Sequence, residues 1–168
     1  MPVEFVPDEI LAVLIRHEVE CIVIGGMAAY LQGSPLPTED VDVVPAEDLD
    51  NLARLSTALY ELDAKVRAAG IEPQPFHHNA QSLAAALIWN LTTTYGDLDI
   101  TLRPSGTQGY DDLKRDAITV KLRGVDVRLA SLADIVRSKE AAGRDKDRRA
   151  LPILRELVSR QLNERHGR

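Results

Sequence analysis

The stretch CIVIGGMAAYLQGSPLPTEDVDVV, residues 21–44, decides the fold. It opens with the continuous apolar run Cys21–Ile24, which is typical of a buried strand. The run passes directly into Gly25 and Gly26, and the small apolar residues that follow predict a short helix. Glycines at such a turn let backbone amides approach a ligand, and a helix N-terminus favours anions. A strand-to-helix turn also needs glycine for purely steric reasons, so phosphate binding requires support from elsewhere in the chain.

Two pairs of carboxylates follow on segments that predict strands. Asp40 and Asp42 are separated by one apolar residue, and so are Asp97 and Asp99. Side chains two apart on a strand point to the same face, so each pair places two negative charges side by side. Mg²⁺ takes hard oxygen ligands and suits this arrangement, and a third acid beside the first pair would complete a site for two metal ions. A solvated strand face is the alternative for either pair alone.

The rest of the pattern predicts a mixed α/β fold with a helical C-terminal tail. Ser131 can cap a helix that ends at Gly143, and Gly124 suits a hairpin turn. Pro73 and Pro75 predict a loop that holds His77 and His78 in an exposed position. Periodicity predicts a first helix capped by Asp8, further helices over residues 26–31, 46–69, 80–89, 131–142 and 146–164, and strands over residues 21–24, 41–44, 91–94, 98–102, 118–122 and 125–129.

Composition narrows the class of protein. The chain has 168 residues, 45% of them hydrophobic and 27% charged, which excludes collagen-like and wholly disordered proteins. This length predicts one domain, or a domain with a small helical appendix. Cys21 is the single cysteine, so neither an internal disulfide nor a cysteine-based zinc site is possible. Residues 1–10 carry three acids and no Lys or Arg, unlike a targeting peptide, and no run is long and apolar enough to span a bilayer. We therefore expect a cytoplasmic protein without membrane contacts.

Charge is divided unevenly along the chain. Residues 137–168 contain ten basic and five acidic residues, which leaves ten basic and 21 acidic residues in positions 1–136. A basic C-terminal segment on an acidic body is typical of a surface that faces phosphates or RNA. A solvated amphipathic helix explains the same pattern equally well.

Taken together, these segments resemble the nucleotidyltransferase superfamily with the DNA polymerase β-like fold. Its signature is a hydrophobic residue, glycine, glycine or serine, a spacer, and two acids that alternate with hydrophobic residues. Here Ile24-Gly25-Gly26 is followed by thirteen residues and then by Asp40-Val41-Asp42-Val43, and Asp99 is the third acid on a later strand. The segments 38–42, 96–100, 127–139 and 139–147 are similar to those of small bacterial nucleotidyltransferases related to the AbiEii abortive-infection toxins. The resemblance extends over residues 21–154.

The resemblance implies a small mixed sheet flanked by helices, with a core over residues 1–130 and a helical segment over residues 131–168 packed on it. It also implies the roles of the site residues. Asp40, Asp42 and Asp99 would be the catalytic residues and the ligands of Mg²⁺ or Mn²⁺. The residues that would bind the nucleotide are Gly25, Gly26, Thr38, Lys139, Arg144 and Asp147. Leu36 stands where these proteins often carry a basic residue, which leaves the choice of nucleotide open.

The implied activity is transfer of a nucleoside monophosphate from a nucleoside triphosphate (NTP) to an acceptor. We expect the acceptor to be RNA, such as the 3′ end of a tRNA, and the protein to be a toxin of a toxin–antitoxin or phage-defence pair with a cognate antitoxin. A small-molecule nucleotidyltransferase of the aminoglycoside-modifying kind is one alternative. The other is a non-catalytic nucleotide-binding or antitoxin-like module, although such a module would have no reason to keep three mutually repelling carboxylates.

Overall fold

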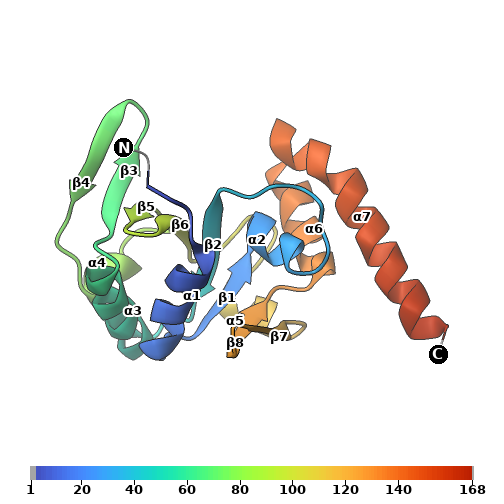
Figure 1. Ribbon diagram of the computed structural model, residues 1–168, viewed down its shortest axis with the longest axis horizontal. Coiled ribbons are helices and arrows are strands. Elements are labelled where there is room, and N and C mark those ends of the chain that lie inside the picture. The colour runs from blue at the N-terminus through green and yellow to red at the C-terminus, as the bar shows by residue number, and fades with distance from the viewer. Residues whose placement is uncertain (1–2, 168) are drawn as a thin grey trace.

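The computed structural model describes residues 3–167 of the chain. Within this range, eight strands form one sheet in the order β4-β3-β5-β6-β2-β1-β8-β7 (Figure 1). The pairs β2/β6 and β1/β8 are parallel and the other neighbouring pairs are antiparallel. The strands are β1 (Cys21–Ile24), β2 (Asp40–Pro45), β3 (Lys65–Ala68), β4 (Ile71–Pro75), β5 (Ile88–Thr93), β6 (Gly96–Thr101), β7 (Ile118–Leu122) and β8 (Val125–Leu129).

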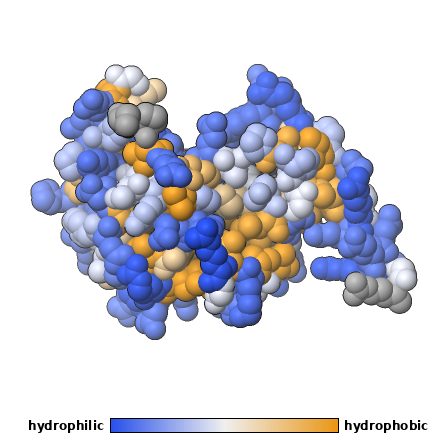
Figure 2. Space-filling view, in the orientation of Figure 1, coloured by the Kyte–Doolittle hydropathy of each residue, from blue (hydrophilic) through white to orange (hydrophobic). Residues whose placement is uncertain are grey.

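The helices lie around this sheet. They are α1 (Pro7–Arg16), α2 (Gly25–Tyr30), α3 (Leu49–Glu61), α4 (Ala80–Ala84), α5 (Tyr110–Lys114), α6 (Leu132–Ala142) and α7 (Asp145–His166). Helix α1 contacts β2, β6 and β8 as well as α3, whereas α6 packs against α7 and α2. The C-terminal helices therefore lie at the opposite end of the molecule from the β3–β4 hairpin (Figure 1). In the space-filling view the outline is notched between these two ends (Figure 2).

The two central strands have one apolar and one polar face. Val41 and Val43 of β2 and Leu98 and Ile100 of β6 are buried in the core, while the acids between them are only partly buried. Because side chains alternate across a strand, burial of the apolar set directs the acids to the opposite face. This face is the one that the candidate site occupies. The mixed sheet with flanking helices confirms the expected fold class.

Local signals set the position of α6, which faces the site. Ser131 caps the helix by accepting a hydrogen bond from the backbone N–H of Asp134, at 3.1 Å. The helix ends at Gly143, whose φ of 62° is the left-handed conformation that glycine adopts at helix C-termini. Both boundaries agree with the sequence-based prediction.

The structure corrects the prediction in the middle of the chain. The helix expected over residues 46–69 ends at Glu61, because Asp63 has a φ of 50° and the following residues pair as β3. The helix expected over residues 80–89 ends at Ala84 and is followed by β5. The expected Pro73–Pro75 loop belongs to strand β4, and His78 is buried rather than exposed, with its Nδ1 2.7 Å from the Ser56 hydroxyl. Helix α5 was not predicted.

Candidate active site

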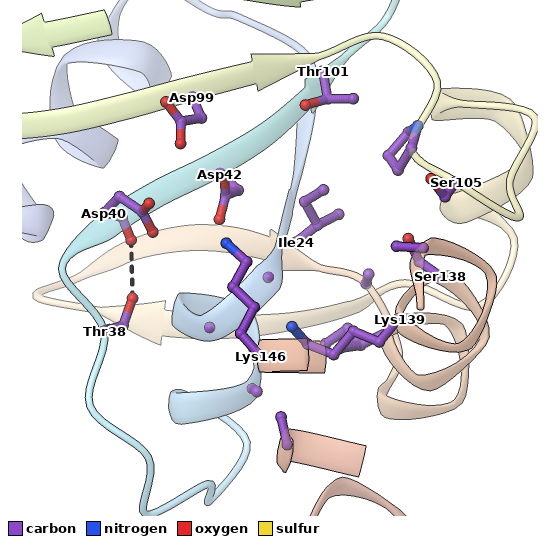
Figure 3. A pocket seen from close by; sticks show the side chains of 18 of the residues that line it. Ile24, Thr38, Asp40, Asp42, Asp99, Thr101, Ser105, Ser138, Lys139 and Lys146 are labelled. Atoms are coloured by element: carbon purple, nitrogen blue, oxygen red, sulfur yellow. Dashed lines mark hydrogen bonds between the residues drawn. The ribbon is translucent and has the colours of Figure 1, made fainter. Parts of the chain in front are cut away.

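Three carboxylates from two neighbouring strands converge on the polar face of the sheet. The parallel register of β2 and β6 places Asp42 opposite Asp99 and Asp40 opposite Asp97. Each of Asp40, Asp42 and Asp99 offers an oxygen, and these oxygens all lie within 4.8 Å of one another (Figure 3). Asp97 is not part of this group. The structure therefore brings together the three acids that the sequence singled out.

The charge of this cluster is poorly compensated. Burial, followed by repulsion from Asp40 and Asp99, raises the pKa of Asp42 to about 7, and the positive charges of Lys146 and Lys139 only partly oppose this effect. Burial also raises the pKa of Asp99, against the opposing effect of Arg67. A divalent cation would remove the repulsion, and three carboxylates are a donor set that Mg²⁺ and Mn²⁺ accept. The residues present therefore fit a metal ion.

The two glycines make room for the cluster. Gly25 has a φ of +67°, and a Cβ built on it would collide with the carboxylate of Asp42. A Cβ on Gly26 would lie 3.1 Å from Oγ1 of Thr38. Thr38 in turn donates a hydrogen bond from this hydroxyl to the backbone carbonyl of Asp40, at 3.0 Å (Figure 3). Glycine is thus required here so that β2 and its first acid pair can approach the turn after β1.

A cleft of about 1070 Å³ opens in front of the carboxylates. One wall consists of the carboxylates and the glycine turn, and the other consists of residues from α6 and α7. Lys139 and Lys146 come from these two helices, and the amine of Lys146 points toward Asp42 (Figure 3). Leu36 also lines the cleft. The cleft therefore has an acidic wall and a basic wall, which suits a metal-bound polyphosphate.

The basic wall contains a buried acid of its own. Asp147 is fully buried and accepts hydrogen bonds from Nε of Arg144, at 2.7 Å, and from Nζ of Lys139, at 3.4 Å. Burial raises the pKa of Asp147, but the hydrogen bond and charge of Arg144, with Lys139, outweigh this effect and the pKa is lowered overall. Arg144 is largely exposed and Lys139 is largely buried. The three predicted residues are thus in contact with one another.

Sequence reasoning missed two residues at the site. Lys146 lies within the segment 139–147 that carried the resemblance, and its position beside Asp147 was an available signal. Arg67 donates a hydrogen bond to Oδ1 of Asp99, at 2.8 Å. It was missed because the residues around it were predicted to be helical, and no local signal relates β3 to the acids on β6.

Comparison with known proteins gives the fold. No family model and no curated protein matches the chain. The solved structures that resemble it include three whose similarity extends over most of the chain. A Thermotoga maritima protein assigned as a nucleotidyltransferase has 20% sequence identity and a TM-score of 0.52 over 96% of this chain and 97% of its own. The lincosamide antibiotic adenylyltransferase LnuA, solved with lincomycin bound, has 12% identity and a TM-score of 0.61 over 93% of this chain and 99% of its own.

The third structure is the antibiotic-resistance factor ANT(2'')-Ia, with 14% identity and a TM-score of 0.54 over 95% of this chain and 90% of its own. At these identities the likeness defines the architecture, and the chain has the nucleotidyltransferase fold. Among the described residues, no helix is long and apolar enough to cross a membrane.

Proposed function

We propose that the protein is a metal-dependent nucleotidyltransferase that moves a nucleoside monophosphate from an NTP to an acceptor hydroxyl. The observation that carries the proposal is the convergence of Asp40, Asp42 and Asp99 within 4.8 Å, directly beside the glycine turn. Three clustered carboxylates weaken the fold unless they bind a cation, so their presence on one face of a cleft favours a catalytic site over a non-catalytic module.

In this proposal Asp40, Asp42 and Asp99 hold Mg²⁺ or Mn²⁺, which supplies charge neutralisation of the phosphates and activation of the attacking hydroxyl when bound. The acceptor oxygen forms a bond to the α-phosphorus, the bond between that phosphorus and the β-phosphate oxygen breaks, and pyrophosphate leaves. Asp99 lies at the edge of the cluster toward β5 and orients the acceptor hydroxyl, whose proton passes to this carboxylate or to water.

The remaining cleft residues bind the triphosphate. Gly25 and Gly26 leave the backbone accessible to it, with Thr38 at the side. Lys139, Lys146 and Arg144 supply positive charge to the phosphates, and Asp147 orients Lys139 and Arg144. In this reading the cleft lies between a core of residues 1–130 and a helical segment of residues 131–168, since both contribute lining residues.

RNA, such as a tRNA 3′ end, is our first candidate for the acceptor. The support is the basic C-terminal segment, from which Lys146 and Arg149 line the cleft. Other arginines of α7 are engaged in ion pairs, for example Arg148 with Asp145 and Arg155 with Glu140. The support from α7 therefore comes mainly from Lys146 and Arg149, which line the cleft.

A small molecule is the second candidate, and a specific observation favours it. This chain spans 99% of LnuA, a lincosamide antibiotic adenylyltransferase, and 90% of ANT(2'')-Ia, an antibiotic-resistance factor. The similarity of fold therefore extends over nearly the whole of both proteins.

The biological role we propose is that of a cytoplasmic toxin with a cognate antitoxin, on the basis of the resemblance to AbiEii-type proteins. Induced expression should then arrest growth, and the Asp42→Ala variant should not. Normal growth with the active enzyme would contradict the toxin role without affecting the proposed chemistry.

The decisive experiment incubates the protein with Mg²⁺, each α-labelled NTP in turn, and either total RNA or a panel of aminoglycosides and lincosamides. We expect label from one NTP to enter one acceptor class, with release of pyrophosphate. Label in tRNA that disappears after removal of the 3′-terminal nucleotide supports the first candidate, and label in a drug supports the second. No transfer with any combination would contradict the proposed function.

A further inference from the structure

Arg67 lies on β3, two strands away from the third carboxylate, and its side chain reaches across β5. Its guanidinium donates one hydrogen bond to Oδ1 of Asp99, at 2.8 Å, and another to the backbone carbonyl of Leu91 on β5, at 2.6 Å. It also forms an ion pair with Oδ2 of Asp97, at 3.3 Å. One planar group therefore joins a carboxylate of the cluster to the backbone of the neighbouring strand.

The sheet register explains why Arg67 points to this face. Lys65 of β3 lies opposite Thr92 of β5, and Thr92 lies opposite Asp97 of β6. Residues opposite one another in a sheet share a face, and so do residues two apart on one strand. Arg67 is two residues after Lys65, so it shares the face of the acids.

The pairing of β3 with β4 is irregular beside Arg67. Lys65 pairs with Pro75 of β4, whereas Ala68 pairs with Ile71, so the register shifts by one residue in the interval that contains Arg67. Continuing the first register would place Pro73 opposite Arg67, and proline has no backbone N–H to offer the ladder. Arg67 alone therefore lies opposite two residues of β4, Glu72 and Pro73, so the extra residue belongs to β4 and the bulge bends β4. Strand β3 keeps its regular alternation through Arg67.

Asp97, the acid on β6 outside the cluster, secures the other side of Arg67. Its Oδ1 accepts a hydrogen bond from the Thr92 hydroxyl, at 2.9 Å, while its Oδ2 faces the guanidinium. Asp97, which Thr92 holds, and the Leu91 carbonyl thus fix Arg67, and Arg67 fixes one oxygen of Asp99. In a cluster of three like charges, Asp99 would otherwise relax away from its neighbours.

We propose that Arg67 is a positioning residue for Asp99, held in place by Asp97 and the Leu91 carbonyl, and that it keeps this carboxylate oriented for metal binding; this inference rests on the proposed function. The role depends on the fork shape of the guanidinium rather than on its charge alone. A lysine at this position keeps the charge but cannot bridge two carboxylates and a carbonyl in one plane.

Charge and shape make opposite predictions for Mn²⁺ binding. If Arg67 acted through charge alone, Arg67→Lys would leave Mn²⁺ affinity unchanged, and Arg67→Ala would tighten binding because a nearby positive charge is lost. If Arg67 positions Asp99, both variants bind Mn²⁺ more weakly. Residues that orient metal ligands are commonly worth about 10-fold to 100-fold in metal affinity or activity.

The test titrates Mn²⁺ into the nucleotide-free protein, follows free Mn²⁺ by electron paramagnetic resonance, and measures kcat and KM for the NTP identified above. We expect Arg67→Lys and Arg67→Ala each to raise the Mn²⁺ dissociation constant by about tenfold and to lower kcat by about tenfold, with KM nearly unchanged. Lys65→Ala is the matched control, because Lys65 lies on the same strand and face but pairs with Asp63 at 3.7 Å. It should bind Mn²⁺ and turn over as the wild type does.

Wild-type Mn²⁺ affinity and kcat in Arg67→Lys would overturn the inference, and so would equal defects in the Arg67 and Lys65 variants. Melting curves of each variant show whether a defect reflects unfolding. If the wild type transfers no nucleotide but binds Mn²⁺ in an Arg67-dependent manner, the positioning role stands and the proposed function fails. If it transfers nucleotide with no dependence on Arg67, the reverse holds.

Discussion

Two acids beside the cleft, Asp42 on the sheet wall and Asp147 on the helix wall, have pKa values that are shifted in opposite directions. On the sheet wall, burial and then repulsion from Asp40 and Asp99 raise the pKa of Asp42 to about 7. On the helix wall, Asp147 is fully buried between Arg144 and Lys139, and its pKa is lowered. Asp147 is thus compensated by cations of its own chain, whereas the carboxylates of the sheet wall are only partly compensated. Under the proposed function, the difference separates an acid that stabilises the fold from acids that bind a cation.

The largest effect that we expect from this contrast is on activity. Asp42→Ala removes one of the three converging carboxylates and should lower kcat for nucleotidyl transfer by at least about 10²-fold, because electrostatic stabilisation of the transition state is lost. The fold should be unaffected, since Asp42 lies on the cleft face of β2 rather than in the apolar core. Steady-state transfer assays beside circular dichroism spectra check both parts. Unchanged turnover would remove the sheet wall from the mechanism.

Asp147→Ala should instead act on stability. It leaves Lys139 without its buried partner and removes the acceptor of the Arg144 N–H at the start of α7, so unfolding free energy should fall by about 2–3 kcal/mol. Urea unfolding measures this change. Asp145→Ala is the control on the same turn: its carboxylate is exposed and pairs with an exposed Arg148, so its effect should stay below about 1 kcal/mol. Equal effects of the two variants would refute the contrast.

The pH dependence of stability should reveal the raised pKa of Asp42 on the sheet wall. The folded protein holds a proton on Asp42 up to about pH 7, whereas the unfolded chain releases it near 3.8. The stabilisation of the folded state by this proton is therefore fully present below pH 3.8 and is lost as pH rises through 7. The unfolding free energy falls over this range with a slope of at most about 1.4 kcal/mol per pH unit. In EDTA, unfolding free energies of the wild type should fall relative to those of Asp42→Asn between pH 5 and pH 7. Parallel profiles would show that Asp42 is not the group responsible.

The smallest effect concerns the outer part of the helix wall. If the acceptor is RNA, changing Arg148 and Arg149 to Ala should weaken RNA binding and reduce the slope of log K against log salt by at most about 1.4 units, as expected for two phosphate contacts to a single strand. NTP binding should change little. Because Arg148 already pairs with Asp145, the reduction should fall below this limit. Identical salt series for wild type and double variant would exclude these arginines from acceptor binding.

Local sequence signals were sufficient for the parts of the chain that build both walls. The apolar run Cys21–Ile24 predicted β1, and the alternation around Asp40 and Asp42 predicted β2. Ser131 and Gly143 predicted both ends of α6, which places Lys139 in the cleft. Each of these features depends on neighbours within a few residues, so the order of residues alone carries the information.

The segment between α3 and α4, which forms β3 and β4, could not be predicted in this way. The leucines of α3 have a helical spacing that continues through Leu62. The helix ends where Asp63 adopts a left-handed backbone conformation. Residues 65–68 become a strand because they pair with β5, which is a tertiary contact. Arg67 therefore lies at the site because of the order of the strands in the sheet. The spacing of residues in the sequence gave no indication of this position.

Metal binding tests the central claim most directly, because only the sheet wall should respond. At a Mn²⁺ concentration about 100 times the dissociation constant, binding should stabilise the wild-type protein by about 2.7 kcal/mol, which raises the melting temperature by about 5–10 °C. Asp42→Asn replaces a carboxylate ligand with a neutral amide and should show much less of this rise, while Asp145→Ala should respond as the wild type does. A melting temperature that does not respond to Mn²⁺, or that rises equally in wild type and Asp42→Asn, would contradict a cation site at Asp40, Asp42 and Asp99.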